Sequence, residues 1–241
     1  MPEPIDLSQI RALTWDIGGT VFNWHDTIKD EVSALAASRG VELDPAKFTN
    51  TWRRSMFVEL GKMRAGELPR TNADGLHRMV LDELAAEYPA LELTPADRDA
   101  LNTVWHRMRA WPDAAAALAR LRERYTVVVL TVMSAAIAVD CSKHNGIDWD
   151  AIISCEFLSH YKPDAGAYLG GLQLLGVEPS QALMCAAHPG DLRAAMAAGL
   201  RSAYVPRPGE RGEGKDPDLS PQPDFDINAT DFTDLADQLL A

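Results

Sequence analysis

The stretch Ala12-Leu13-Thr14-Trp15-Asp16-Ile17-Gly18-Gly19-Thr20 decides the fold. A short, mostly apolar run is followed directly by the carboxylate of Asp16 and then by the glycine pair at positions 18 and 19. The run predicts a central strand over 12–15, since a strand covered on both faces loses the alternation of polar and apolar residues. Gly18 and Gly19 allow the backbone to turn tightly and to point amides inward. We therefore expect Asp16 to be held at the end of a buried strand.

Four further apolar runs predict parallel strands beside the first one: Thr126 to Leu130, Ile152 to Ser154, Ala182 to Ala186, and Ser202 to Val205. Helix-like stretches lie between them: Ala114 to Arg124, Ala165 to Leu175, and Leu192 to Ala198. Strands that alternate with helices are typical of an α/β fold. The sequence predicts a doubly wound, mostly parallel sheet with a Rossmann-like core.

The segment from Asp26 to Arg109 has a different character, with helical patterns and no convincing strand. The patterns cover Lys29 to Ser38, Phe48 to Met63, Ala73 to Glu87, and Arg98 to Arg109. Trp111-Pro112-Asp113 then supplies a stop and the start of a new helix. We expect a helical cap of residues 25–110 inserted after the first strand, and a core formed by residues 1–24 and 111–241.

Composition limits the class of protein. The 241 residues with 46% hydrophobic content can bury a core as one large or two small domains. The formal net charge of -12 disfavours nucleic acid and anionic membranes as partners. No window resembles a membrane span or a signal peptide, so we expect a soluble cytoplasmic protein. Cys141, Cys155 and Cys185 form no C-x-x-C pair and fit buried thiols in a reducing compartment.

Residues 206–223 are dense in proline, glycine and charge, and predict an exposed loop. Gly209 to Lys215 matches the glycine and lysine spacing of a phosphate-binding loop. Asp216, however, stands where the magnesium-binding serine or threonine belongs, and the proline-rich tail cannot begin a helix. We expect no nucleotide site there.

Four segments carry chemical groups at or soon after predicted strand ends: Trp15 to Thr20, Leu130-Thr131-Val132, Tyr161-Lys162-Pro163-Asp164, and Ala187-His188-Pro189-Gly190-Asp191. The carboxyl ends of adjacent parallel strands converge on one crevice, where such folds bind ligands. Each segment alone also has a structural interpretation as a glycine turn, a strand end, a loop or a helix cap. Their joint occurrence in this order and context favours a shared site.

The chemistry of that site would centre on Asp16, which can attack carbon or phosphorus and form an ester. Lys162 would hold Asp16 ionised and oriented, and Asp191 could position the lysine or a hydrolytic water. Thr20 and Thr131 are short hydroxyl donors for a carboxylate or a phosphate.

This order of residues resembles the haloacid dehalogenase superfamily over nearly the whole chain. Phosphatases of that superfamily carry a second aspartate two positions after the nucleophile, where it protonates the leaving group, and a paired acidic motif that helps to hold magnesium. Here that position is Gly18. The resemblance therefore argues against a standard phosphatase.

Several features are similar to the type II 2-haloacid dehalogenase branch: Asp16-x-x-Gly19-Thr20, Tyr168 after Lys162, the 186–191 segment, Trp52-Arg53, Gly75 to Arg78, and Ala203 to Pro208. The resemblance implies hydrolysis of short 2-haloalkanoic acids, such as haloacetates and 2-halopropionate, through an aspartyl ester and without metal or cofactor. It implies that Asp16 is the nucleophile, that Arg53 receives the halide and that Thr131 binds the substrate carboxylate. It also implies support for Asp16 and the hydrolytic step from Lys162, Tyr168 and Asp191.

Three further residues are assigned to the substrate and halide site. We place Thr20 and Tyr168 with Arg53 and Thr131 around the substrate and halide. We also place His188 there, either as a donor near Lys162 and Asp191 or as a cap of the loop before the last helix.

Two departures from the family pattern bear on the halide pocket. Val132 stands where the family usually has asparagine, so the pocket loses a polar donor. Arg54 follows Arg53, and helical spacing points the two side chains about 100° apart, so only one can face the pocket. Because the Trp52-Arg53 pair is similar to the family pattern, we choose Arg53 as the arginine that faces the pocket.

Two other functions stay open at this stage. Asp16, Thr131, Lys162 and Asp191 would also suit a magnesium-dependent phosphatase of the same superfamily. Gly18 and Val132 could instead mark a binding protein that keeps the fold without turnover. The expected partner is a small haloacid, and a homodimer is a candidate assembly because the inserted helices of this family often pair.

Overall fold

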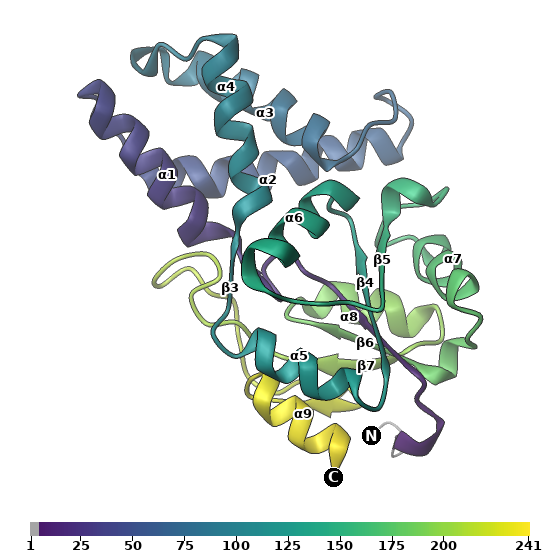
Figure 1. Ribbon diagram of the computed structural model, residues 1–241. Coiled ribbons are helices and arrows are strands. Elements are labelled where there is room, and N and C mark those ends of the chain that lie inside the picture. The colour runs from purple at the N-terminus through teal and green to yellow at the C-terminus, as the bar shows by residue number, and fades with distance from the viewer. Residues whose placement is uncertain (1–4) are drawn as a thin grey trace.

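The computed structural model describes residues 5–241, which form a six-stranded sheet in the order β5-β4-β1-β6-β7-β8 (Figure 1). Its strands are β1 Ala12–Trp15, β4 Thr126–Thr131, β5 Ala151–Ser154, β6 Ala182–Ala186, β7 Arg201–Tyr204 and β8 Ile227–Asn228. All neighbouring pairs in this sheet are parallel. The predicted mostly parallel α/β fold is confirmed. Because β1 lies between β4 and β6, Asp16 follows a central strand.

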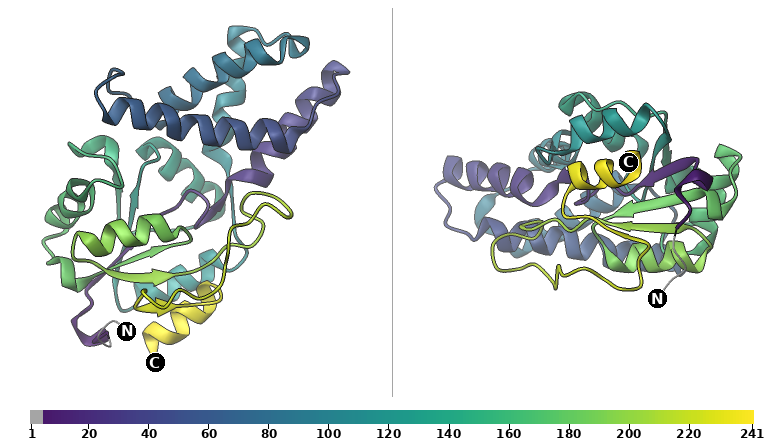
Figure 2. Two further views of the ribbon diagram at one scale, coloured as in Figure 1. Left: turned by 180° about the vertical axis from the view of Figure 1, so that it is seen from behind. Right: turned by 90° about the horizontal axis from the view of Figure 1, so that it is seen from below.

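Both faces of the sheet are buried, which explains the continuous apolar runs (Figure 2). Leu13 and Trp15 of β1 pack in one hydrophobic cluster with α5 Ala114–Arg122, α6 Ala135–Asn145 and α9 Phe232–Leu240. Met184 of β6 packs in a second cluster with α7 Ala165–Leu175 and α8 Pro189–Ala197. Successive strand residues point to opposite faces, so β6 supplies both clusters, with Leu183 and Cys185 in the first and Met184 in the second.

Four helices form a separate layer over the carboxyl edge of the sheet: α1 Trp24–Arg39, α2 Pro45–Arg64, α3 Ala73–Glu87 and α4 Pro95–Asn102 (Figure 1). Local capping sets where they begin. The side chains of Asn23, Asp44, Asn72 and Thr94 each accept a hydrogen bond from a backbone N–H in the first turn. Pro45 and Pro95 suit the first helical position, where no N–H donor is needed.

A two-stranded antiparallel ribbon joins this helical layer to the sheet. It pairs β2 Phe22–Asn23 with β3 Arg109–Ala110. The predicted helix from Arg98 to Arg109 therefore ends early: α4 stops at Asn102, a 3-10 turn covers Thr103–Arg107, and β3 follows. The Thr103 hydroxyl donates to the carbonyl of Ala100 at 2.7 Å, a local bond that competes with the helix.

The remaining 3-10 turns are Leu7–Gln9, Pro89–Leu91, Cys155–Phe157 and Pro179–Gln181. No helix within residues 5–241 has both the length and the apolar character needed to cross a bilayer. The three cysteines are buried as free thiols. Burial raises the pKa of Cys141 to about 12, so that side chain is a neutral thiol.

Candidate active site

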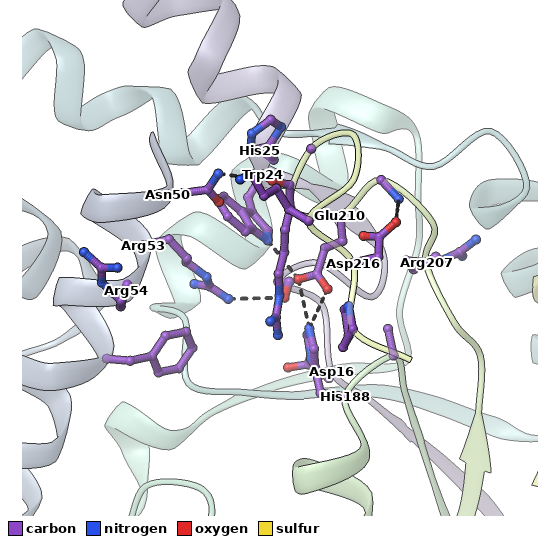
Figure 3. A pocket seen from close by; sticks show the side chains of 18 of the residues that line it. Asp16, Trp24, His25, Asn50, Arg53, Arg54, His188, Arg207, Glu210 and Asp216 are labelled. Atoms are coloured by element: carbon purple, nitrogen blue, oxygen red, sulfur yellow. Dashed lines mark hydrogen bonds and ion pairs between the residues drawn. The ribbon is translucent and has the colours of Figure 1, made fainter. Parts of the chain in front are cut away.

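Asp16 lies at the base of a cavity of about 1850 Å³ between the sheet and the helical layer (Figure 3). Its backbone N–H donates to the carbonyl of Cys185 at 3.1 Å, which fixes the carboxylate at the junction of β1 and β6. The turn that follows requires a glycine at position 19, where φ is +98°. A Cβ at Gly19 would also lie 2.0 Å from Oε1 of Glu210.

The two oxygens of Asp16 have different surroundings. Oδ2 accepts a hydrogen bond from the Thr20 hydroxyl at 2.8 Å and forms an ion pair with Nδ1 of His188 at 3.3 Å. Oδ1 has a longer ion pair, 3.8 Å to Nζ of Lys162. The Thr20 oxygen accepts from the backbone N–H of Ala187 at 3.0 Å, so its hydroxyl hydrogen is directed at Asp16. Oδ1 is therefore the less engaged oxygen.

Lys162 links Asp16 to Asp191. Its ammonium donates to Oδ2 of Asp191 at 2.9 Å, and the Tyr168 hydroxyl donates to Oδ1 at 2.5 Å. Burial lowers the pKa of Lys162, but the carboxylates of Asp191 and Asp16 outweigh burial and raise it. Burial likewise raises the pKa of Asp16, and Lys162 and His188 reverse that effect to hold it below the usual range. Asp16 is thus an ionised carboxylate.

His188 forms a charged pair with Glu210, a residue that sequence reasoning missed. Nε2 of His188 lies 2.9 and 3.0 Å from the two carboxylate oxygens of Glu210. The indole N–H of Trp24, at the start of α1, donates to the same carboxylate at 2.9 Å. Burial lowers the pKa of His188, but Glu210 and Asp16 raise it to about 10, so the ring is an imidazolium.

This arrangement answers the question that the sequence left open for His188. The residue does occupy the N-cap position of α8, but its side chain makes no capping bond. It contacts Asp16 and Glu210 rather than Lys162 and Asp191.

The prediction that residues 206–223 form an exposed loop is wrong at two positions. The segment has no helix or strand, but Arg207 and Glu210 are buried, with exposed fractions of 6% and 7%. Arg207 donates to the carbonyl of Thr20 at 2.9 Å and pairs with Asp113 at 2.8 Å. Composition shows that the loop is rich in proline, glycine and charged residues, which is typical of an exposed loop. Composition does not show contacts with residues far away in the sequence, and such contacts bury Arg207 and Glu210.

Arg53 and Arg54 point in different directions, as their helical spacing requires (Figure 3). Arg53 is buried and directed inward, where one guanidinium nitrogen, Nη2, donates to the carbonyl of Gly18 at 3.2 Å. Its guanidinium lies over the ring of Phe57 at 4.5 Å, and its buried Nη1 has no hydrogen-bond partner within residues 5–241. Arg54 is exposed at the rim. Arg53 therefore has N–H groups to offer an anion beside Asp16.

Some of the other predicted site residues line the cavity, and the others are buried just below its surface. Thr131 lines the cavity, and its hydroxyl oxygen accepts from the backbone N–H of Met133 at 3.1 Å. Val132 also lines the cavity and supplies no donor. Thr20 and Tyr168 are fully buried below the surface of the cavity, where they contact Asp16 and Asp191.

Within the Gly75 to Arg78 segment, Leu76 and His77 are buried in the helical layer. His77 stacks on Trp105 with ring centroids 3.8 Å apart, and its ring nitrogens have no hydrogen-bond partner in the described part of the chain. Burial lowers the pKa of His77 well below its usual value, so the ring is neutral and belongs to the packed interior of the helical layer.

Comparison with known proteins decides the family. The family model of haloacid dehalogenase-like hydrolases matches residues 10–199. The chain belongs to this family. Like the haloacid dehalogenase-like hydrolases in general, it is an enzyme built on a mostly parallel sheet.

Relatives place this haloacid dehalogenase-like hydrolase close to the 2-haloacid dehalogenases. The crystal structure of a defluorinating L-2-haloacid dehalogenase is 35% identical, covers 100% of both chains and superposes with a TM-score of 0.93. A second L-2-haloacid dehalogenase structure is also 35% identical, with a TM-score of 0.91 over 96% of this chain and 99% of that one. The (S)-2-haloacid dehalogenase 4A of Burkholderia cepacia is 24% identical over 86% of this chain and 87% of its own.

Proposed function

We propose that this hydrolase releases halide from short 2-haloalkanoic acids through an ester on Asp16. The observation that carries the proposal is the buried Arg53 guanidinium with unused donor capacity beside an ionised carboxylate. Two relatives at 35% identity are L-2-haloacid dehalogenases, which supports the same substrate class. Asp16, Lys162 and Asp191 would carry the chemistry.

In the first step, Oδ1 of Asp16 attacks the α carbon of the haloacid. An oxygen–carbon bond forms as the carbon–halogen bond breaks, and the halide leaves with the bonding electron pair. Arg53 offers N–H donors where that negative charge grows, which stabilises the transition state more than the ground state. The rings of Trp24 and Phe57 lie 5.5 and 4.5 Å from the guanidinium and help to hold it in place. Thr131, which also lines the cavity, would bind the substrate carboxylate.

In the second step, water hydrolyses the ester at Cγ of Asp16. Asp191 accepts the first proton of the water and returns it to the leaving oxygen, which departs in the 2-hydroxy acid. Lys162 and Tyr168 orient Asp191 for this transfer through their hydrogen bonds to its two oxygens. Thr20 and Tyr168 would act through Asp16 and Asp191, because neither reaches the cavity surface.

A phosphatase reaction fits the site less well because of the space at Gly18. A Cβ there would lie 2.7 Å from Cε of Met133 and 3.0 Å from Nη2 of Arg53. An aspartate at this position, as in phosphatases of the superfamily, would therefore require both Met133 and Arg53 to shift. The buried arginine and the phosphatase acid compete for the same space.

The test is halide release measured by ion chromatography from chloroacetate, bromoacetate, fluoroacetate and 2-chloropropionate, with a chelator present throughout. We expect stoichiometric release of halide and 2-hydroxy acid. Fluoroacetate is included because one relative is a defluorinating enzyme. Phosphate release from phosphate esters that depends on magnesium, with no halide from any haloacid, would replace this proposal with the phosphatase function.

Arg53 and Arg54 provide a matched pair for the halide role. Arg53→Gln should lower kcat/KM for chloroacetate by roughly 10²- to 10³-fold, because a donor to the developing anion is lost. Arg54→Gln should leave kcat/KM almost unchanged, since that side chain is exposed at the rim. Steady-state kinetics of both variants check this, and similar losses in the two would remove Arg53 from the halide site.

A further inference from the structure

We propose that His188, held by Glu210, is the charged donor that stabilises the tetrahedral intermediate when the Asp16 ester is hydrolysed. This inference rests on the proposed dehalogenation and assigns a role in its second step. Glu210 is a positioning residue that acts through His188.

The two Asp16 oxygens carry the argument. Thr20 and His188 both face Oδ2, at 2.8 and 3.3 Å, whereas Oδ1 has only the 3.8 Å ion pair with Lys162. The less engaged Oδ1 is the better nucleophile, because attack from it breaks no hydrogen bond. Oδ2 then becomes the carbonyl oxygen of the ester. It still faces Thr20 and His188.

Hydrolysis moves negative charge onto that oxygen. Water adds to Cγ of Asp16, the carbonyl electron pair moves to Oδ2, and Asp191 takes the water proton. Collapse of the intermediate re-forms the carbonyl and breaks the bond between Cγ and Oδ1. Asp191 returns its proton to Oδ1 in the departing 2-hydroxy acid, and the regenerated acid loses its own proton to solvent. Donors fixed around Oδ2 before the reaction stabilise the charge when it forms.

Glu210 maintains the charge on His188 through this cycle. Esterification neutralises Asp16, so His188 then keeps one of its two anionic partners. The Glu210 carboxylate contacts Nε2 with both oxygens at 2.9 and 3.0 Å and is itself fixed by the Trp24 indole at 2.9 Å. Glu210 is buried and His188 is only partly exposed, so little solvent screens this electrostatic interaction. The ring therefore stays an imidazolium, directed at Oδ2.

The turn after Asp16 is shaped around this carboxylate. A Cβ at Gly19 would meet Oε1 of Glu210 at 2.0 Å, so the glycine provides the space that Glu210 fills. Trp24, which belongs to the helical layer, fixes the same carboxylate from another side. Glu210 is thus seated by two separate parts of the chain.

Rapid-quench kinetics with chloroacetate test the role of His188. In His188→Gln, the first turnover should still release halide close to the enzyme concentration. Ester hydrolysis should slow by about 10²- to 10³-fold, because a charged donor to the oxyanion is lost. Intact-protein mass spectrometry should then show an added carboxymethyl group during turnover. Unchanged hydrolysis, or loss of the halide burst without ester, would overturn the proposal.

Glu210→Gln tests the positioning role through pH. In the ester of the wild type, Glu210 still raises the pKa of His188 above its usual value, so ester hydrolysis should persist to a higher pH than in the variant. Without the carboxylate, that pKa should fall toward the ordinary value of about 6.5, so hydrolysis should slow above it and recover below it. The amount of halide released in the first turnover measures the concentration of correctly folded active sites in each variant. Pre-steady-state profiles that match between the variant and the wild type would remove Glu210 from this role.

Glu213→Gln is the matched control, because Glu213 lies on the same loop but is exposed. Its hydrolysis profile should match the wild type. Failure of the proposed function itself would appear differently, as wild-type enzyme that releases no halide.

Discussion

Replacing Asp16 with asparagine is expected to abolish halide release, with kcat reduced roughly 10⁴-fold or more. The amide has nearly the shape of the carboxylate but lacks the charge and lone pairs needed to attack carbon. The site keeps its other groups, so the loss should reside in chemistry rather than in folding. Ion chromatography of halide from chloroacetate measures it, and intact-protein mass spectrometry should find no carboxymethyl adduct.

Asp26→Asn is the control for this substitution, since Asp26 lines the same cavity at its rim and is partly exposed. Its kcat should stay close to that of the wild type. Halide release by Asp16→Asn at a rate comparable to this control would place the nucleophile on another residue.

Lys162→Met should cost about 3–5 kcal/mol of unfolding free energy at pH 7, because two buried carboxylates lose their shared cation. The side chain of Lys162 is 6% exposed and bridges Asp16 and Asp191. The folded-state pKa of Asp16 is depressed, so its ionisation contributes stability above the unfolded value of 3.8 and loses it as the pH falls below that value. The deficit of the variant should therefore be large at pH 7 and shrink in acid.

Urea denaturation of both proteins at several pH values measures that dependence. Lys29→Met is the matched control, because Lys29 also borders the cavity but forms a partly exposed ion pair with Asp26. Such pairs contribute about 0–1 kcal/mol. Equal losses in the two variants would show that the buried cation is not what stabilises Asp16.

Five of the six strands of the sheet could be predicted from sequence, β5 at one edge included, whereas β8 at the other edge could not. The observed bounds of β1 and β6, Ala12–Trp15 and Ala182–Ala186, equal the predicted ones because both strands are buried on both faces. β8, Ile227–Asn228, has only two residues, too few to show any period. The β2–β3 ribbon escaped prediction for the same reason.

The candidate site followed from the same geometry, since Asp16, Lys162, His188 and Asp191 lie near the carboxyl edge of the parallel strands. Glu210 did not follow, because its loop has no periodicity and its partners lie 22 and 186 positions away. The signal available was its position shortly after Arg207, at the end of the family-like Ala203 to Pro208 run. Only packing could show that this loop turns inward.

The central place of β1 has a consequence for synthesis of the chain on the ribosome. This strand is made first, yet its partners are β4, Thr126–Thr131, and β6, Ala182–Ala186. At about 5–20 residues per second, its apolar run waits several seconds or more for the first of them. A nascent chain that stops before β6 would present Asp16 without the Cys185 carbonyl that anchors its backbone. The segment that carries Asp16 is thus the longest-lived unpaired strand during translation.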